Sequence, residues 1–170
     1  MELREVLLKR RSVRKFTEEA VSEEHINELL HAAMSGPSAC NKKPWEFYVI
    51  SDKDKLKELQ SASKYTKMQA PLAIVVCGNL SHALPLSFSS YWIQDCSAAT
   101  ENILLRAVDL GLGACWCGMH PAEDREALIK EKCGIPDNVI LLSLIAVGYP
   151  SDKLPANDKY EESKVHFNGW

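Results

Sequence analysis

Three arginines and a serine stand within five residues near the start of the chain, in the run Arg10-Arg11-Ser12-Val13-Arg14. Each guanidinium presents a rigid fork of donors that suits phosphate oxygens, and a serine hydroxyl adds one short, directional donor. This spacing favours a clamp for a phosphate-bearing cofactor. A solvated basic helix end explains the same residues, because the helix dipole favours cations near a C-terminus.

A second candidate segment is a polar turn that begins where a predicted helix ends. It reads Pro37-Ser38-Ala39-Cys40-Asn41 and is followed by Pro44-Trp45. The backbone and side chains of such a turn offer hydrogen-bonding groups to a planar heterocycle. Together with the arginine cluster, the turn points to a cofactor that has both a phosphate and a flat ring.

The hydrophobic pattern predicts the elements that position these two segments. Apolar residues at helical spacing predict four shorter helices, over residues 2–10, 22–35, 52–62 and 121–132. Runs of β-branched and aromatic residues predict four strands, at 45–50, 72–77, 114–117 and 140–147. This order predicts an α+β fold with a small mixed central sheet flanked by helices.

The longest predicted helix runs from about Phe88 to Leu110 and is apolar nearly all round. A helix with this pattern lies in the interior or against a partner subunit. Residues 150–170 differ, because prolines and alternating charges precede a few large apolar side chains, the last of them Trp170. They form either a disordered tail or an arm that packs across a neighbouring subunit.

The composition narrows the class of protein. The chain has 170 residues, 46% of them hydrophobic and 25% charged, which suits one soluble globular domain spanning 1–170. A formal net charge of −3 predicts no general attraction to nucleic acid or to a membrane surface. Six cysteines without a signal-peptide pattern predict reduced thiols and a cytoplasmic location. Their spacing, and that of the histidines, predicts no metal site.

The chain resembles the nitroreductase family of FMN-dependent oxidoreductases over nearly its full length. Six segments, in the family's order and spacing, carry the resemblance: Arg10–Phe16, Gly36–Phe47, Gln94–Asn102, Leu110–Gly118, Gly148–Pro150 and Lys164–Trp170. The resemblance implies a homodimer with FMN at the subunit interface. It also implies that the long helix is central to the dimer and that the C-terminal arm is exchanged across it.

The resemblance implies roles for the residues of the arginine cluster. Arg10, Ser12 and Arg14 match the positions that hold the FMN phosphate and ribityl chain, and Arg14 also reaches the pyrimidine edge. Arg11 fits the same cluster through its side chain or backbone. Lys159 stands where the family usually places an arginine that completes the phosphate site. A lysine there keeps the charge and loses the planar fork.

The resemblance also implies contacts with the flavin ring. The turn Pro37-Ser38-Ala39 with Asn41 matches the segment that packs on the isoalloxazine from the other subunit, and Cys115-Trp116-Cys117-Gly118 matches the strand and turn whose backbone lies against the ring. Cys115 and Cys117 are either packing residues or redox groups. No side chain is expected to act as a catalytic residue, because hydride chemistry belongs to flavin N5.

The expected function is an oxidoreductase that takes a hydride from NADH or NADPH and passes electrons to a small acceptor in a ping-pong cycle. Nitroaromatics, quinones and activated enones are the acceptors that the resemblance implies. A flavin carrier or redox sensor with little turnover, and a specialised relative such as a dehalogenase, are alternatives. Tyr65, Phe88 and Tyr91 line the acceptor pocket or belong to the core; the residues leave both open.

Overall fold

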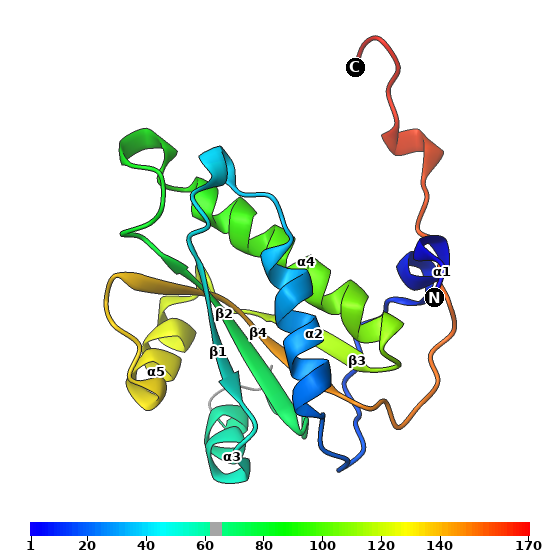
Figure 1. The fold of residues 1–170 in the computed structure, drawn as a ribbon. Coiled ribbons are helices and arrows are strands. Elements are labelled where there is room, and N and C mark those ends of the chain that lie inside the picture. Colours follow the sequence, from blue (N-terminus) through cyan, green and yellow to red (C-terminus); the bar gives the residue numbers. More distant parts are fainter. Residues whose placement is uncertain (62–65) are drawn as a thin grey trace.

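A computed structural model describes residues 1–61 and 66–170 and shows a four-stranded sheet with helices on both faces (Figure 1). The strands are β1 (Trp45–Ile50), β2 (Leu72–Asn79), β3 (Gly113–Gly118) and β4 (Val139–Gly148), in the order β1-β2-β4-β3. All three pairings are antiparallel, which corrects the expected mixed sheet. An apolar run looks alike in either direction, so the pattern along each strand does not determine its direction.

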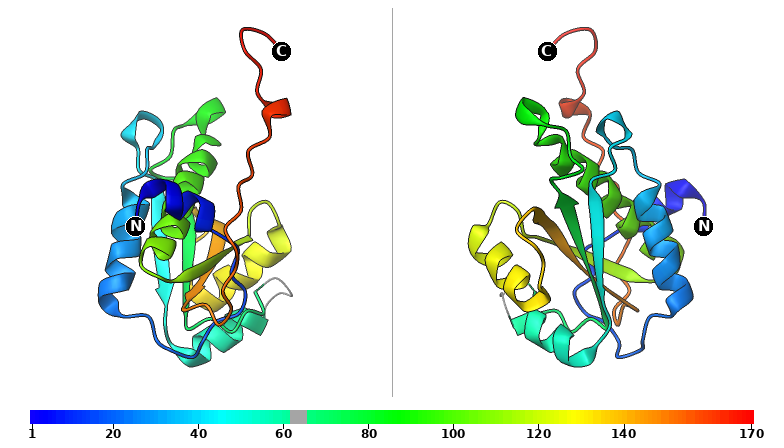
Figure 2. Two further views of the ribbon diagram at one scale, coloured as in Figure 1. Left: turned by 90° about the vertical axis from the view of Figure 1, so that its right-hand side faces the viewer. Right: turned by 60° about the vertical axis from the view of Figure 1, so that its left-hand side comes forward.

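Two helical layers enclose the sheet (Figure 2). Helices α2 (Glu23–Met34) and α4 (Tyr91–Asp109) cover one face, and α3 (Lys53–Ser61) and α5 (Glu123–Cys133) cover the other. Residues 72–78 of β2 are buried, because a hydrophobic core packs on each face of the sheet. This explains why the sequence of β2 is a continuous apolar run rather than an alternating one. None of the helices in the described ranges is long and apolar enough to span a membrane.

Helix α2 begins and ends as its sequence predicts. The Ser22 side chain accepts a hydrogen bond from the His25 backbone N–H at 3.2 Å, which caps the first turn. At the other end, the Asn102 side-chain amide of α4 donates to the Ala32 carbonyl at 3.0 Å. This bond holds the last turn of α2 against α4.

Helix α4 begins at Tyr91, three residues later than expected. Leu86–Phe88 instead form a short 3-10 turn, in which Leu86 has a φ of 57°. Such a positive φ interrupts a regular helix, and Leu86 and Phe88 are 88% and 56% exposed. Phe88 is therefore not a core residue. Tyr65 lies outside the described residues.

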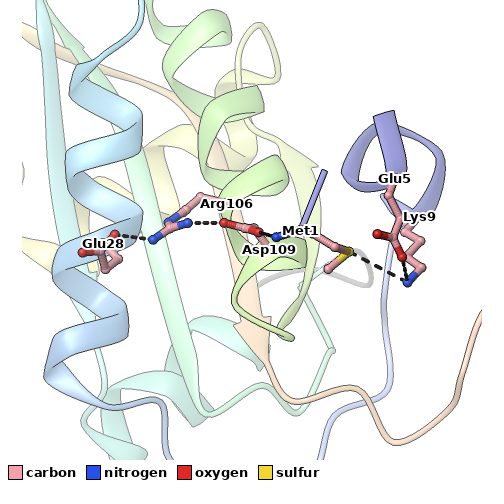
Figure 3. A network of polar contacts seen from close by, with 6 residues as sticks. All are labelled: Met1, Glu5, Lys9, Glu28, Arg106 and Asp109. Atoms are coloured by element: carbon pink, nitrogen blue, oxygen red, sulfur yellow. Dashed lines mark hydrogen bonds and ion pairs between the residues drawn. The ribbon is translucent and has the colours of Figure 1, made fainter. Parts of the chain in front are cut away.

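Helix α1 (Leu3–Lys9) is attached to α4 by charged groups (Figure 3). The Met1 amino group donates to Asp109 at 2.8 Å, and Asp109 pairs with Arg106, which reaches Glu28 on α2 at 2.6 Å. The hydrogen bond from the amino group holds the pKa of Asp109 below its usual range. Leu3 remains largely exposed, whereas Asp109, Arg106 and Glu28 are partly buried.

Residues 151–170 lie outside both cores and are exposed throughout. The first part follows the N-terminal segment, where the Asn157 N–H donates to the Leu8 carbonyl at 2.9 Å. Beyond it the chain rises past α1 and away from the sheet, as the red end of Figure 1 shows. Phe167 and Trp170 are 84% and 104% exposed, so this segment buries none of its largest side chains against its own protomer.

Candidate cofactor site

The arginine cluster lies against the edge strand β3. The Val13 N–H donates to the Ala114 carbonyl at 3.0 Å, and Ser12 forms a parallel bridge with Ala114. Gly113 permits this approach, because a Cβ there would stand 2.7 Å from the Val13 side chain. One parallel bridge thus joins a segment from the start of the chain to a strand about a hundred residues later.

A cleft of about 400 Å³ opens beside this junction. Its walls combine three cationic side chains, one thioether and the second half of β3: Arg14, Lys67, Arg125, Met68 and Cys115–Gly118. A second hollow of about 310 Å³ also has Arg14 in its wall, together with Ser12. The structure therefore brings these two predicted residues together with all four predicted residues of β3.

Arg10 and Lys159 converge on one carboxylate of α4. The Arg10 Nε lies 3.6 Å from Glu101, and the charge of Lys159 also acts on Glu101. Burial raises the pKa of Glu101 above its usual range, and the two cations oppose that rise. Lys159 from the arm thus lies in the electrostatic neighbourhood of Arg10, although nearly 150 residues separate them in sequence.

Arg11 is engaged differently from its neighbours. Its guanidinium Nη1 donates to the Pro155 carbonyl at 2.6 Å, which attaches the first part of the arm to the N-terminal segment. Arg14, by contrast, makes a 3.3 Å contact with the Ser12 carbonyl beside the cleft. The structure therefore separates the cluster into a side chain that holds the arm and one that lines the cleft.

The two cysteines of β3 lie on the buried face that packs toward α5. Cys115 and Cys117 are 3% and 5% exposed. A hydrogen bond with the Cys117 thiol, opposed by burial and helped by the charges of Arg14 and Arg10, lowers the pKa of Cys115 to about 7. The same hydrogen bond raises the pKa of Cys117. Trp116 points to the opposite face and is 36% exposed.

The polar turn lies elsewhere in the protomer. Figure 1 shows it at the N-terminal end of α4, whereas residues 10–14 lie beside β3, which follows the C-terminal end of that helix. The Ala39 N–H donates to Asp95 at 2.8 Å, and the Ser38 hydroxyl accepts from the Lys43 N–H at 3.0 Å. Pro37, Ser38, Ala39 and Asn41 thus form one turn, whose hydrogen bonds in the described part of the chain run to α4 and within the turn itself.

Three residues near these segments escaped the sequence-based prediction. Asp95 accepts a hydrogen bond from the turn. Glu101 pairs with Arg10 and also interacts with the charge of Lys159, and Arg125 donates a hydrogen bond to the Gly118 carbonyl at 3.3 Å. Asp95 carried a usable signal, because an acid on the apolar stripe of a helix needs a buried partner. Glu101 and Arg125 are charged residues on helices, and their neighbours come from distant parts of the chain.

The arrangement suits an anionic group next to a flat one. Within the described ranges, Glu101 is the carboxylate that lies within 4.0 Å of a guanidinium of the cluster, so Arg14 has no acidic partner there. Such cations can neutralise a phosphate dianion. No group of three histidine, cysteine or acidic side chains gathers as metal ligands in the part of the chain that the structure describes.

Comparison with known proteins gives concordant matches. The sequence model of the Nitroreductase family matches residues 7–66 and 60–149. A protein of Archaeoglobus fulgidus with the provisional name NADH dehydrogenase/NAD(P)H nitroreductase is 41% identical, over 95% of this chain and 94% of its own length. A solved structure from Bacteroides thetaiotaomicron with the same provisional name is 40% identical and has a TM-score of 0.93, covering 100% of this chain and 99% of that chain. An FMN-dependent nitroreductase from Clostridium difficile is 31% identical, with a TM-score of 0.88 and coverages of 97% and 98%.

Proposed function

Because this chain belongs to the nitroreductase family, we propose that it reduces small electron-poor acceptors with electrons from NADH or NADPH, as a homodimer. It is an FMN-dependent NAD(P)H oxidoreductase. We further propose a ping-pong order for the two half-reactions, a class of acceptors and a role for individual residues. The observation that carries the proposal is the junction of the arginine segment with β3, which sets cations beside a cleft large enough for a planar ring.

The residues of this junction fit FMN by their chemistry. Arg10, Ser12 and Arg14 supply charged and hydroxyl donors for a phosphate and a ribityl chain, and Lys159 adds a charge near Arg10. Gly118 leaves room for close approach, since a Cβ there would meet no atom within 4 Å. Bound FMN supplies the hydride-accepting chemistry, so these residues bind and orient it.

We assign to Arg14 an electrostatic role in addition to binding. It lines both hollows, and its guanidinium Nη1 donates to the Ser12 carbonyl at 3.3 Å. A fixed cation there would stabilise negative charge that develops at the pyrimidine edge of the ring. Backbone groups of Cys115, Trp116, Cys117 and Gly118 would face the ring, because their strand forms one wall of the cleft.

The complete site is proposed to need two copies of the chain. One protomer holds the cation cluster and β3 together but keeps the turn of Pro37, Ser38, Ala39 and Asn41 apart from them. A second copy would supply its turn, and residues 150–170 of the single domain 1–170 would cross to cover it. The uncovered Phe167 and Trp170 side chains support that exchange.

Nitroaromatics, quinones and activated enones are the proposed acceptors. Lys67 and Arg125 on the walls of the cleft suit acceptors that gain negative charge, and Trp116 and Met68 offer flat and flexible apolar contacts. Ping-pong order would follow if donor and acceptor take turns in this one cleft. A flavin carrier with little turnover remains the alternative. We also propose a reducing compartment such as the cytoplasm, with which the absence of a disulfide among the six cysteines, all within the described residues, agrees.

The first test is an absorbance spectrum of the purified protein, before and after anaerobic addition of NADH or NADPH. Flavin bands that bleach, followed by steady oxidation of the nicotinamide when a nitroaromatic or a quinone is added, are the expected result. Flavin that stays oxidised with both nicotinamides would favour the carrier. A protein that takes up no added FMN would reject the proposed site.

A further inference from the structure

Asp95 is a buried acid on an otherwise apolar face of α4. It is 6% exposed, between Trp92 at 4% and Cys96 at 0%. Burial of a carboxylate destabilises the folded state unless hydrogen bonds compensate for its lost hydration. Its Oδ1 accepts the Ala39 backbone N–H at 2.8 Å, so a residue of the central helix holds the backbone of the polar turn.

The turn that Asp95 holds has an unfavourable backbone conformation. Cys40, Asn41 and Lys43 have φ values of 49°, 54° and 50°. These lie in the left-handed region, which residues other than glycine seldom occupy. Such conformations persist where the surroundings impose them, and they are frequent at ligand sites. Within the turn, the Ser38 carbonyl and hydroxyl accept from the Asn41 and Lys43 N–H groups at 2.9 and 3.0 Å.

The hydrogen bonds within the turn and the hydrogen bond to Asp95 have different effects on the turn. The bonds to Ser38 close the turn on itself but do not fix its orientation relative to the rest of the molecule. The Asp95–Ala39 bond does so, because Asp95 belongs to the helix that packs against the sheet. A charged acceptor makes this bond stronger than a neutral one would be.

We propose that Asp95 is a positioning residue of the flavin site, which orients the turn of residues 38–43 without touching the cofactor. The inference rests on the proposed function, in which this turn packs on the ring bound by the partner subunit. Without Asp95, the strained residues would relax and the turn would present its groups in many orientations. FMN would then bind to a less organised surface.

Asn102 offers a matched control on the same helix. It lies seven residues after Asp95, which is about two helical turns and places both on one face. Its side chain also bonds a backbone group, the Ala32 carbonyl, at 3.0 Å. That bond holds the end of α2 rather than the turn. Asn102→Ala therefore removes a comparable tether without releasing Ala39.

The test compares Asp95→Ala, Asp95→Asn and Asn102→Ala with the unchanged protein, each stripped of flavin and titrated with FMN. We expect Asp95→Ala to bind FMN at least about tenfold more weakly. Asp95→Asn keeps an oxygen acceptor of the same shape and should recover most of the affinity. Asn102→Ala should lower the melting temperature but leave the FMN affinity within about twofold, since it leaves the bond to Ala39 intact.

Limited trypsin digestion gives a second readout that does not involve the flavin. The Lys42–Lys43 bond lies inside the turn, and Pro44 protects the next bond from trypsin. Asp95→Ala should speed cleavage after Lys42 and Asn102→Ala should not. If Asp95→Ala is insoluble, Asp95→Leu fills a similar volume without an acceptor and replaces it.

Three results would overturn the inference. Asp95→Ala with unchanged FMN affinity and cleavage rate would show that the turn is held without this bond. Equal loss of FMN affinity in Asn102→Ala would indicate general destabilisation instead of positioning. An unchanged protein that binds no FMN would reject the proposed function as well, and is recognised before any variant is compared.

Discussion

At the scale of single residues, similar side chains in the cation cluster have different tasks. Arg11 is committed to the Pro155 carbonyl of the arm, whereas Arg14 stands at the wall of two hollows with a 3.3 Å contact to the Ser12 carbonyl. A guanidinium that lacks a close acidic partner keeps its charge available to an incoming anion. Arg14 is therefore the member of the cluster whose loss should weaken cofactor binding most directly.

Replacement of Arg14 by alanine should weaken FMN binding by about 2 kcal/mol, because a charge-assisted contact is lost. Titration of flavin-free protein with FMN, followed by fluorescence quenching, measures this loss. Arg4→Ala is the control, since Arg4 is an exposed arginine on α1. Equal affinity in Arg14→Ala and the unchanged protein would contradict the assignment of Arg14 to the clamp.

The thiols predict a pH dependence of chemical labelling. Cys115 has a pKa lowered from 9.0 to about 7, so its reactive thiolate increases as the pH rises through 7. Burial raises the pKa of Cys96 to about 12, so Cys96 stays protonated over the same range. Labelling by iodoacetamide, read peptide by peptide in a mass spectrometer, should therefore rise from pH 6 to pH 8 at Cys115 and stay low at Cys96.

Added FMN should slow the labelling of Cys115, because its strand forms the wall of the cleft. A thiolate favoured by the native state also links pH to stability. The contribution of this thiolate to the free energy of unfolding is fully present above pH 9, the ordinary pKa of a thiol. It is lost as the pH falls through 7. Labelling of Cys115 that does not change with pH would contradict the lowered pKa.

At the scale of elements, the site depends on how closely residues 10–17 approach the sheet. The Val13 N–H bonds the Ala114 carbonyl of β3, and the Thr17 N–H bonds the Tyr149 carbonyl after β4, at 3.0 and 2.9 Å. Gly113 provides the space for the first bond. A side chain at this glycine would therefore disturb the cation cluster from the sheet side.

Gly113→Ala should destabilise the fold by about 1–3 kcal/mol, because its Cβ would stand 2.7 Å from the Val13 side chain. Thermal or urea unfolding measures the change. Gly118→Ala adds the same methyl group to the same strand where no atom lies within 4 Å, so its stability should change little. Equal stabilities of the two variants would show that the segment and the strand have room to separate.

At the scale of the whole molecule, one protomer leaves much of its apolar surface uncovered. Leu3 on α1, Leu86 before α4, and Phe167 and Trp170 in the arm are each more than half exposed. Among the described residues, the hydrogen bonds and the ion pair that hold the arm lie in its first part, at Ser151, Asp152, Pro155 and Asn157. A second copy of the chain would cover these surfaces and favour assembly through the hydrophobic effect.

Truncation after Pro150 should give a monomer that has lost flavin, because it removes Lys159 and the apolar part of the arm. Size-exclusion chromatography and the flavin absorbance of each peak measure the two effects. Lys153→Ala, at an exposed position early in the arm, is the control and should stay dimeric and yellow. A stable yellow dimer without the arm would reject the exchange.

Within the described residues, the local pattern of the sequence was sufficient for every α-helix and strand, to within about three residues, but not for the short 3-10 helices. Apolar spacing and caps such as Ser22 act between near neighbours, so they can be read without tertiary contacts. The same holds for the cation cluster and for the six segments that revealed the family. Only the tertiary structure decided strand direction, the attachment of Arg11 to the arm, the lowered pKa of Cys115 and the bond from Asp95 to the turn. Each of these depends on groups brought together by packing across the fold, or on distances and burial that local spacing does not contain.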